Sequence, residues 1–379
     1  MKLALIQDQL LTQAGSERMF QYMVEEFPEA DIYTSAYNPQ TTWPAFQNHQ
    51  IKTSWTNYFI KNHGQFKTFY PLLANVFKYW NFYGYDIILS SSATVAKYIS
   101  RFDGTHICYC YFPTRAIWNT DDYFNKSTKS IKVLLFRVLL SYFKKQDIAA
   151  AQRVDKFIGI SEYSRRAITQ IYGKEADVLY CPIDFERFKQ GNSEKKGNHY
   201  LIVSRLERWK KLDYAIEAFN LLKLPLKVIG SGADAEEIKA AASDNIQFLG
   251  NIDDASLVKE YGRAKAVLFT PELEYGLVPL EANAAGTPVI AYGRGGVTET
   301  MLPVNKQLTG SSFPTAVFFD EQTPKSLMAA INQFESLTFD RSALMRHAEK
   351  YNIPSFKKAL RKYVDDAATE AKGFPKKKR

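Results

Sequence analysis

The chain has 379 residues, of which 46% are hydrophobic, 14% aromatic and 23% charged, and its formal net charge is +9. This length predicts two domains, and the apolar and aromatic content excludes an intrinsically disordered chain. No apolar run reaches the roughly 18 residues of a membrane-spanning helix, and the N-terminal apolar stretch meets Gln7 and Asp8 too early for a signal peptide. The 3 cysteines exclude a disulfide framework and lack metal-site spacing. We therefore expect a cytoplasmic protein, soluble or peripheral on the inner face of the cell membrane.

Apolar runs alternate with helical patterns along the whole sequence, which predicts parallel sheets covered by helices. In the first half we expect strands at Lys2–Ile6, Asp31–Thr34, Asp86–Ser90, His106–Tyr111, Lys156–Ile160 and Asp177–Tyr180, with helices at Glu17–Glu26 and Ser161–Ile171. In the second half we expect strands at Tyr200–Val203, Leu226–Ile229, Ile246–Leu249, Ala266–Phe269, Pro288–Ala291 and Ala316–Phe319. The helices expected there are Asp213–Leu221, Ala235–Ala242, Ala255–Gly262, Pro279–Ala285, Pro324–Phe334 and Ile353–Thr369.

A polar, irregular stretch at Phe185–Gly197 interrupts this alternation and predicts a domain boundary. We expect an N-terminal domain over residues 1–184 and a C-terminal domain over 198–350. A final helix over 351–369 and a basic disordered tail over 370–379 follow. Two consecutive α/β domains joined by a short linker predict a ligand site at the carboxyl ends of their strands.

Basic residues interleave with large aromatic side chains in two stretches of the first half. No acidic residue occurs between Asp31 and Asp86, or from Tyr123 to Gln146. The composition is typical of an anionic membrane surface first, a solvated basic face second and nucleic acid last, because no nucleic-acid-binding motif accompanies it. We expect Lys52–Lys78 and Lys126–Lys145 to contact anionic lipid, and we expect no nucleic-acid partner. The cationic residues of these stretches are Lys52, Lys61, Lys67, Lys78, Lys126, Lys129, Lys132, Arg137, Lys144 and Lys145.

The segment Thr270–Ala291 combines a glycine turn with a short helix. Gly276–Val278 leads into a helix with proline in its first turn, and the free amides of such a turn bind anions. Glu281 is expected in that first turn, where it could accept hydrogen bonds from sugar hydroxyls beside a bound phosphate. Glu272 and Glu274 stand just upstream. The alternative is that these glutamates only satisfy the helix N-terminus, and the residues alone leave both interpretations open.

Three further segments follow strands. Four cations in Ser204–Lys211 suit a diphosphate, although ordinary basic loops are common. The small-residue turn Gln13–Arg18 would let backbone approach a ligand. Gly230–Ala235 matches the G-x-G-x-x-A dinucleotide fingerprint, but its strand is not the first of its domain, so close packing is the preferred interpretation. The sequence has no Asp-x-Asp pair and no P-loop, so we expect no metal ion and no cofactor.

Together these segments resemble the retaining glycosyltransferases of family 4, most closely the GDP-mannose-type mannosyltransferases of O-antigen and exopolysaccharide assembly. The resemblance runs from about Lys2 to Val364 and rests on stretches such as HICYCYFPTRAIW, YLIVSRLERWKKLDYAIEAFN and GLVPLEANAAGTPVIAYGRGGVTET. It implies the GT-B fold, an α/β architecture of two Rossmann-like domains whose parallel sheets face each other across a central cleft. It also implies metal-independent transfer of a hexose, mannose as the best choice, from a GDP- or UDP-sugar to a hydroxyl of a lipid-linked saccharide in cell-surface polysaccharide biosynthesis.

The resemblance also implies roles for individual residues. Gly15 would approach the donor sugar or phosphate, and Arg205 and Lys210 would hold the diphosphate. The other donor-binding positions it implies are Gly250, Asn251 and Ile252 near the nucleobase, Glu272 and Glu274 near the sugar, the amides of Gly276, Leu277 and Val278 on the phosphates, and Glu281 on the ribose. The catalytic set would be Arg205, Lys210, Glu274 and Tyr111, with no metal ligand.

Two positions depart from the family pattern. Leu273 stands where the family has a glutamate that contacts the transferred sugar, so Glu272 or Glu274 would take that role in a segment one residue shorter. Tyr111 stands where the family has a histidine, and a phenol is a poor base at neutral pH. These departures motivate an alternative, a catalytically impaired partner subunit that binds sugar nucleotide. A nicotinamide-dependent dehydrogenase, suggested only by Gly230–Ala235, is the last alternative.

Overall fold

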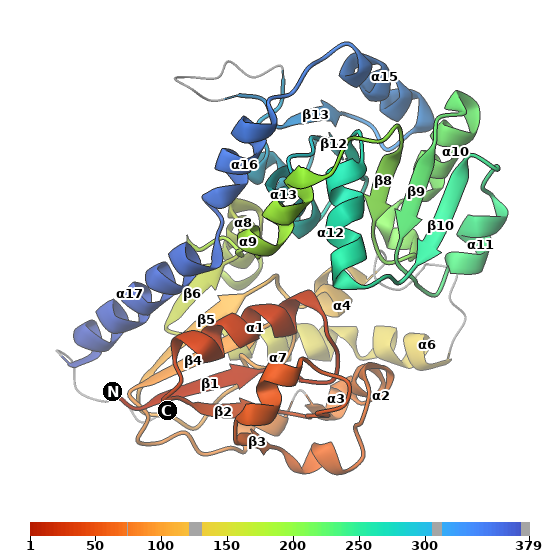
Figure 1. Cartoon of the computed structure of the whole chain (residues 1–379). Coiled ribbons are helices and arrows are strands. Elements are labelled where there is room, and N and C mark those ends of the chain that lie inside the picture. Colours follow the sequence, from red (N-terminus) through yellow and green to blue (C-terminus); the bar gives the residue numbers. More distant parts are fainter. Residues whose placement is uncertain (74, 121–130, 305–312, 373–379) are drawn as a thin grey trace. The chain divides into compact units, whose positions relative to one another are not determined.

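The structure is a computed structural model that describes residues 1–73, 75–120, 131–304 and 313–372. The chain divides into two compact units, one of Met1–Tyr180 with Phe356–Arg379 and the other of Cys181–Ser355. Each unit is a parallel sheet with helices packed on it (Figure 1). The predicted α/β fold class is thereby confirmed.

In the first unit the described strands form a seven-stranded sheet of order β3-β2-β1-β4-β5-β6-β7, and every neighbouring pair is parallel. The strands are β1 (Leu3–Gln7), β2 (Asp31–Thr34), β3 (Ile51–Thr53), β4 (Ile87–Ser92), β5 (Thr105–Cys110), β6 (Lys156–Gly159) and β7 (Ala176–Val178). The strand order changes direction between β1 and β4. Ligands of such sheets bind at that point, outside the carboxyl ends of the strands.

In the second unit the described strands form a six-stranded parallel sheet of order β10-β9-β8-β11-β12-β13. The strands are β8 (Tyr200–Val203), β9 (Leu226–Ile229), β10 (Ile246–Gly250), β11 (Val267–Phe269), β12 (Val289–Tyr292) and β13 (Ala316–Phe319). Here the order changes direction between β8 and β11. Central strands such as β1 and β12 are buried along their whole length, because helices cover both faces of a parallel sheet.

Helices connect the strands. In the first unit they are α1 (Gly15–Glu26), α2 (His63–Thr68), α3 (Tyr70–Leu73), α4 (Arg115–Trp118), α6 (Ile131–Val138), α7 (Leu140–Gln152) and α8 (Glu162–Tyr172), with short 3-10 turns at Pro44–Asn48, Trp55–Tyr58 and Val76–Lys78. In the second unit they are α9 (Phe185–Phe188), η4 (Lys189–Ser193), η5 (Arg208–Lys210), α10 (Asp213–Leu222), α11 (Ala235–Ala240), α12 (Asp254–Arg263), α13 (Leu277–Ala284), α14 (Val297–Thr300), α15 (Pro324–Glu335) and α16 (Arg341–Glu349). The last helix, α17 (Ile353–Lys372), begins in the second unit and continues in the first, where it runs beside β6 (Figure 1).

Three differences from the sequence expectations concern strand β3, the expected linker and the expected tail. Strand β3 was not predicted, because its three residues are only half-buried and carry no long apolar run. Phe185–Gly197, interpreted as a linker, instead forms α9 and η4 within the second unit, which begins at Cys181. Residues 370–372, assigned to a disordered tail, continue α17, and Glu370 pairs with Lys156 at 2.7 Å. Residues 373–379, with the rest of that predicted tail, lie outside the described residues.

Candidate functional site

Two predicted segments meet at the change of strand order in the second unit. The basic loop follows β8 and the segment beginning at Thr270 follows β11, and these two strands are neighbours in the sheet. The Thr270 hydroxyl donates to the backbone oxygen of Lys210 at 2.8 Å, which fastens the two loops together. The edge at which open α/β sheets bind their ligands therefore carries both segments.

The basic loop is organised around the indole of Trp209. The ammonium of Lys210 lies 4.0 Å from the ring centroid, and the guanidinium of Arg205 lies 5.3 Å from it. Glu207 accepts from the indole N–H and from Arg205, the latter at 3.3 Å. One aromatic ring thus holds two cations near each other at the end of β8, an arrangement that suits two linked phosphate groups.

The glycine-rich segment after β9 is filled by backbone of the same unit. Gly230 has a φ of +128°, and a Cβ there would lie 2.0 Å from the backbone oxygen of Ser204. A Cβ on Gly232 would lie 2.2 Å from the oxygen of Leu206, whose N–H donates to Ser231 at 3.0 Å. These glycines let the loop after β9 pack against the basic loop, in agreement with the interpretation that they serve close packing.

The segment after β11 is held by the loop after β12. The backbone oxygen of Leu273 accepts from the N–H of Gly296 at 2.8 Å, and a Cβ on Gly295 would lie 2.3 Å from that same oxygen. Glu272 is exposed and Glu274 is half-buried. Gly295 and Gly296 therefore determine the path of the segment Glu272–Glu274, where a glutamate that contacts the sugar is expected.

Helix α13 begins two residues earlier than its proline suggested. It starts at Leu277, with Gly276 as an N-cap that contributes no side-chain hydrogen bond. Glu281 is consequently the fifth residue of the helix, and its expected place in the first turn is wrong. The first turn of α13 contains no acidic residue, so Glu281 does not satisfy the helix N-terminus.

Glu281 has a partner that the sequence did not reveal. The hydroxyl of Tyr261 on α12 donates to its carboxylate at 2.7 Å, and burial together with this carboxylate raises the pKa of Tyr261. Tyr261 is a core residue, so this contact orients the Glu281 carboxylate from the buried side. No local motif marks such a contact between two helices.

The positions assigned to the nucleobase lie on the same edge of the sheet. Strand β10 ends at Gly250, which has a φ of +65° and whose oxygen accepts from Gly230 N–H at 2.8 Å. Asn251 is exposed and Ile252 is half-buried. Because β9 separates β10 from β8, these positions are two strands away from the basic loop.

Gly15 and Tyr111 belong to the first unit, and the structure brings their surroundings together. Gly15 is the first residue of α1, and Tyr111 follows β5. The Tyr111 hydroxyl is 2.9 Å from the hydroxyl of Ser91 and donates to the backbone oxygen of Ser16 at 3.1 Å. Tyr111 thus ties the end of β5 to β4 and to the start of α1.

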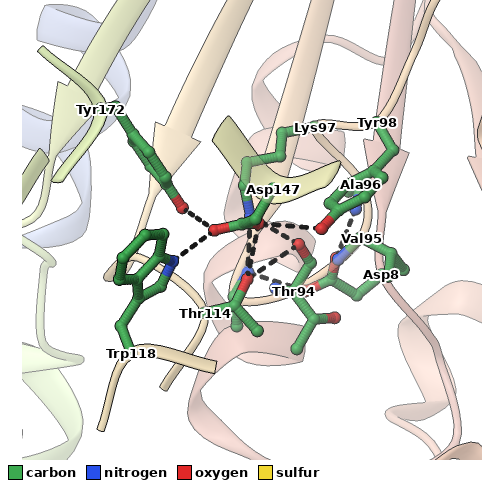
Figure 2. Close-up of polar contacts among 11 residues, drawn as sticks. Asp8, Thr94, Val95, Ala96, Lys97, Tyr98, Thr114, Trp118, Asp147 and Tyr172 are labelled. Carbon is green, nitrogen blue, oxygen red and sulfur yellow. Dashed lines mark hydrogen bonds and ion pairs between the residues drawn. The ribbon is translucent and has the colours of Figure 1, made fainter. Parts of the chain in front are cut away.

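The change of strand order in the first unit is occupied by the chain itself. The carboxylate of Asp8, directly after β1, accepts from the four successive backbone N–H groups of Ala93 to Ala96 at 2.6–2.9 Å. Figure 2 shows it against Val95 and Ala96. Successive amides of this kind are a phosphate site when they are open. Here the Asp8 side chain fills the site; burial raises the pKa of its carboxyl group, and the hydrogen bonds from these amides oppose that rise.

A buried ion pair lies next to these amides (Figure 2). Lys97 and Asp147 are 2.8 Å apart and neither side chain is exposed. Lys97 also donates to the backbone oxygen of Thr94 at 2.7 Å and to the hydroxyl of Thr114 at 3.0 Å. In a second group of contacts Asp147 accepts from the hydroxyls of Tyr98, Thr114 and Tyr172 and from the indole of Trp118. The pair joins α7 to the segments that follow β4 and β5.

Comparison with known proteins identifies the architecture. The structure superposes on Anabaena Alr3699/HepE in complex with UDP with a TM-score of 0.66, at 14% identity and with 97% of this chain and 100% of that chain covered. It superposes on sucrose-phosphate synthase of Thermosynechococcus elongatus with a TM-score of 0.71, at 14% identity, covering 98% and 100%. Two parallel α/β units with these neighbours define the GT-B fold.

Sequence comparison finds a family match in the second unit. Residues 183–353 match the family model of the glycosyl transferases group 1, which is nearly all of the second unit. The alpha-1,3/1,6-mannosyltransferase ALG2 of Dictyostelium discoideum is 24% identical over 333 residues, covering 72% of this chain and 76% of that protein. Human ALG2 is 25% identical over 297 residues, covering 68% and 66%. The second unit thus carries the match to the glycosyl transferases group 1 model, and the ALG2 relatives align with about 70% of the chain.

Proposed function

We propose that the protein is a retaining, metal-independent hexosyltransferase that moves a sugar, mannose as the best choice, from a nucleoside diphosphate to a hydroxyl of a lipid-linked saccharide. The observation that carries the proposal is the pair of cations on Trp209, at the change of strand order, where the neighbouring strand β11 leads to the uncapped start of α13. The Alr3699/HepE neighbour holds UDP, which supports a nucleoside diphosphate as the donor. The ALG2 relatives are mannosyltransferases, which supports mannose.

The chemistry follows from the charges that develop. The bond between the anomeric carbon and the phosphate oxygen breaks, the diphosphate takes the electron pair, and the sugar becomes oxocarbenium-like. Arg205, Lys210 and the amides of Gly276–Val278 would stabilise the leaving diphosphate, because they are oriented before it departs. The acceptor oxygen then bonds the anomeric carbon on the same face, and its proton passes to the departing phosphate oxygen. No group of three His, Cys, Asp or Glu side chains within the described residues is placed to hold a metal.

Tyr111 would act in this scheme as a positioning residue. Its hydroxyl contacts Ser91 and Ser16, and a phenol is a poor base at neutral pH. Gln7 Oε1 and Ser92 Oγ lie buried at the neighbouring strand ends and have no hydrogen-bond partner among the described residues. These oxygens are suited to hydroxyl groups of a saccharide acceptor, which we place in the first unit. A lipid-linked acceptor would bring the protein to the inner face of the cell membrane as a peripheral protein.

Calorimetric titration with GDP, UDP and ADP tests the donor site. One diphosphate should bind, and Arg205→Ala should weaken it at least ten-fold, because a charge-assisted hydrogen bond to phosphate contributes about 1.5–3 kcal/mol. Arg208→Ala is the matched control, because both arginine side chains are 57% exposed and Arg208 is paired with Glu237 instead. Equal effects of the two variants, or binding of NAD alone, would refute the assignment.

A transfer assay separates the enzyme from the alternative, a catalytically impaired partner subunit. The departures at Leu273 and Tyr111 motivate that alternative. The enzyme predicts release of nucleoside diphosphate in the presence of an acceptor lipid extract, and Glu274→Ala should slow it. Tight donor binding with neither transfer nor donor hydrolysis would favour the partner subunit.

A further inference from the structure

One helix face of the first unit is apolar and exposed. The exposed fractions are 72% for Ile131, 62% for Leu134 and 73% for Val138, and Leu135, Leu139 and Tyr142 are exposed as well. These six residues, which we call the α6–α7 apolar face, follow one another at the i, i+3, i+4, i+7, i+8, i+11 spacing of a single helix side. In a water-soluble helix this is the side that is normally buried, so its exposure needs a partner.

The two helices present this face as one surface. The N–H of Leu139 donates to Leu135 at 3.1 Å and that of Phe143 to Leu139 at 3.0 Å, so helical hydrogen bonds on both sides of the single turn residue Leu139 join α6 to α7. At 3.6 residues per turn the six side chains cover an arc of roughly 140°. Their rise of about 1.5 Å per residue gives a stripe about 16 Å long.

The opposite side of α7 is firmly attached to the unit. Phe143, Asp147, Ala150 and Ala151 are buried, and Asp147 is the centre of the buried network in Figure 2. Rotation of α7 to bury the apolar face would withdraw the Asp147 carboxylate from Lys97 and leave a buried charge unpaired. The apolar face is therefore fixed outward.

The charges around the face favour an anionic surface. Lys145 continues the stripe by one turn and is exposed, and Lys144 lies 5.1 Å from the ring centroid of Trp118. The other basic stretch, Lys52–Lys78, offers less free positive charge, since Lys52 is paired with Asp31 at 2.7 Å. Lys126 and Lys129 lie outside the described residues.

We propose that the α6–α7 apolar face inserts into the interfacial region of an anionic lipid bilayer, with Lys145 at the headgroups. Amphipathic helices with flanking cations lie in this way, with their apolar face buried about 5–10 Å into the headgroup and acyl boundary. The area of a stripe about 16 Å long on a helix about 10 Å wide is far smaller than the ~800 Å² per partner that a stable protein dimer buries. This face would provide the membrane association that the proposed function includes. Its insertion rests on that part of the proposed function and is independent of the donor site. No helix within the described ranges has the length and apolarity needed to cross a bilayer.

Vesicle sedimentation of matched variants tests this proposal. Leu134→Asp is compared with Leu221→Asp, since both leucines are 62% exposed and Leu221 lies on α10 of the other unit. On phosphatidylcholine vesicles with 30% phosphatidylglycerol, Leu134→Asp should reduce binding at least ten-fold, equivalent to about 1.4 kcal/mol, and Leu221→Asp should leave it unchanged. Lys145→Gln should reduce binding about five-fold on these vesicles and not at all on neutral ones.

Equal binding by the two aspartate variants, or binding of wild type that ignores lipid charge and salt, overturns the proposal. A wild-type dimer that Leu134→Asp dissociates, with vesicle binding unchanged, overturns it in favour of a second copy. Titration of each variant with GDP and UDP keeps the two hypotheses apart. If a variant loses vesicle binding and keeps its nucleotide affinity, the result bears only on the membrane surface. If wild type binds neither GDP nor UDP, the result bears only on the proposed donor site.

Discussion

Replacing Lys97 with methionine removes the cation of the buried pair and keeps most of the volume of the side chain. Burial is the largest single influence on the pKa of Lys97 and lowers it, but the charge and hydrogen bond of Asp147 together with the neighbouring Cys110 and Cys108 raise the pKa by more, so the lysine is charged in the folded state. In Lys97→Met the carboxylate of Asp147 keeps its hydroxyl and indole donors and loses its only ion-pair partner within the described residues.

The magnitude follows from the separation. Two unit charges 2.8 Å apart attract by about 6 kcal/mol at an effective dielectric constant of 20. Part of this lost attraction is offset because methionine avoids the cost of removing the ammonium group from water. A further part is offset because the remaining hydrogen-bond donors still stabilise the Asp147 carboxylate. We therefore expect the free energy of unfolding to fall by about 3 kcal/mol, the lower end of the range for breaking a buried pair.

Urea denaturation measures this loss, and hydrogen exchange localises it. Protection should fall in the segments around Thr94 and Thr114, whose oxygens Lys97 holds, and persist in the second unit. The control is Lys362→Met, which breaks an exposed pair with Asp366 at 2.6 Å and should leave the urea midpoint unchanged. If Lys97→Met unfolds at the same midpoint as Lys362→Met, the network does not stabilise the first unit and the reasoning fails.

Two further predictions concern the second unit. Burial lowers the pKa of Lys196 from 10.5 to about 7, so the unfolded chain binds a proton between these values that the folded chain does not, and stability rises with pH across that window. The melting temperature of wild type should therefore rise more between pH 7 and 9.5 than that of Lys196→Met. The control is Lys195→Met, at the exposed neighbouring residue, which should behave like wild type. Parallel curves of melting temperature against pH for all three proteins would contradict this prediction. Gly295→Ala should push the backbone oxygen of Leu273 aside and weaken donor binding at least ten-fold by calorimetry. Gly173→Ala, also at positive φ but with open space, should leave donor affinity as in wild type.

The positions of most strands along the chain could be predicted because parallel strands are covered on both faces and so read as uninterrupted apolar runs. Asp31–Thr34, Tyr200–Val203, Leu226–Ile229 and Ala316–Phe319 are strands with the expected limits. β3 escaped because an edge strand of three half-buried residues has neither the run nor the alternation that identifies a strand. The start of α13 was misplaced because proline is compatible with any position in the first turn, and here it is the third residue.

The candidate site was visible where its residues are consecutive and hidden where they are not. Arg205 and Lys210 follow one strand, so their shared position could be inferred. The contact of Tyr261 with Glu281 joins two helices, and the pairing of Lys52 with Asp31 joins two strands. The second pair also shows why an acid-free stretch does not measure surface charge, because the compensating acid comes from outside the stretch.

The carboxylate of Asp8 has a consequence for how two units of the same architecture divide their ligands. A covalently tethered anion is present at an effective concentration that dissolved phosphate cannot match, so the amides of Ala93 to Ala96 are permanently occupied. One aspartate therefore withholds these four amides from any external anion while the sheet remains that of a nucleotide-binding fold. Under the proposed function, nucleoside diphosphate and acceptor then do not compete for the amides at this point of the first unit.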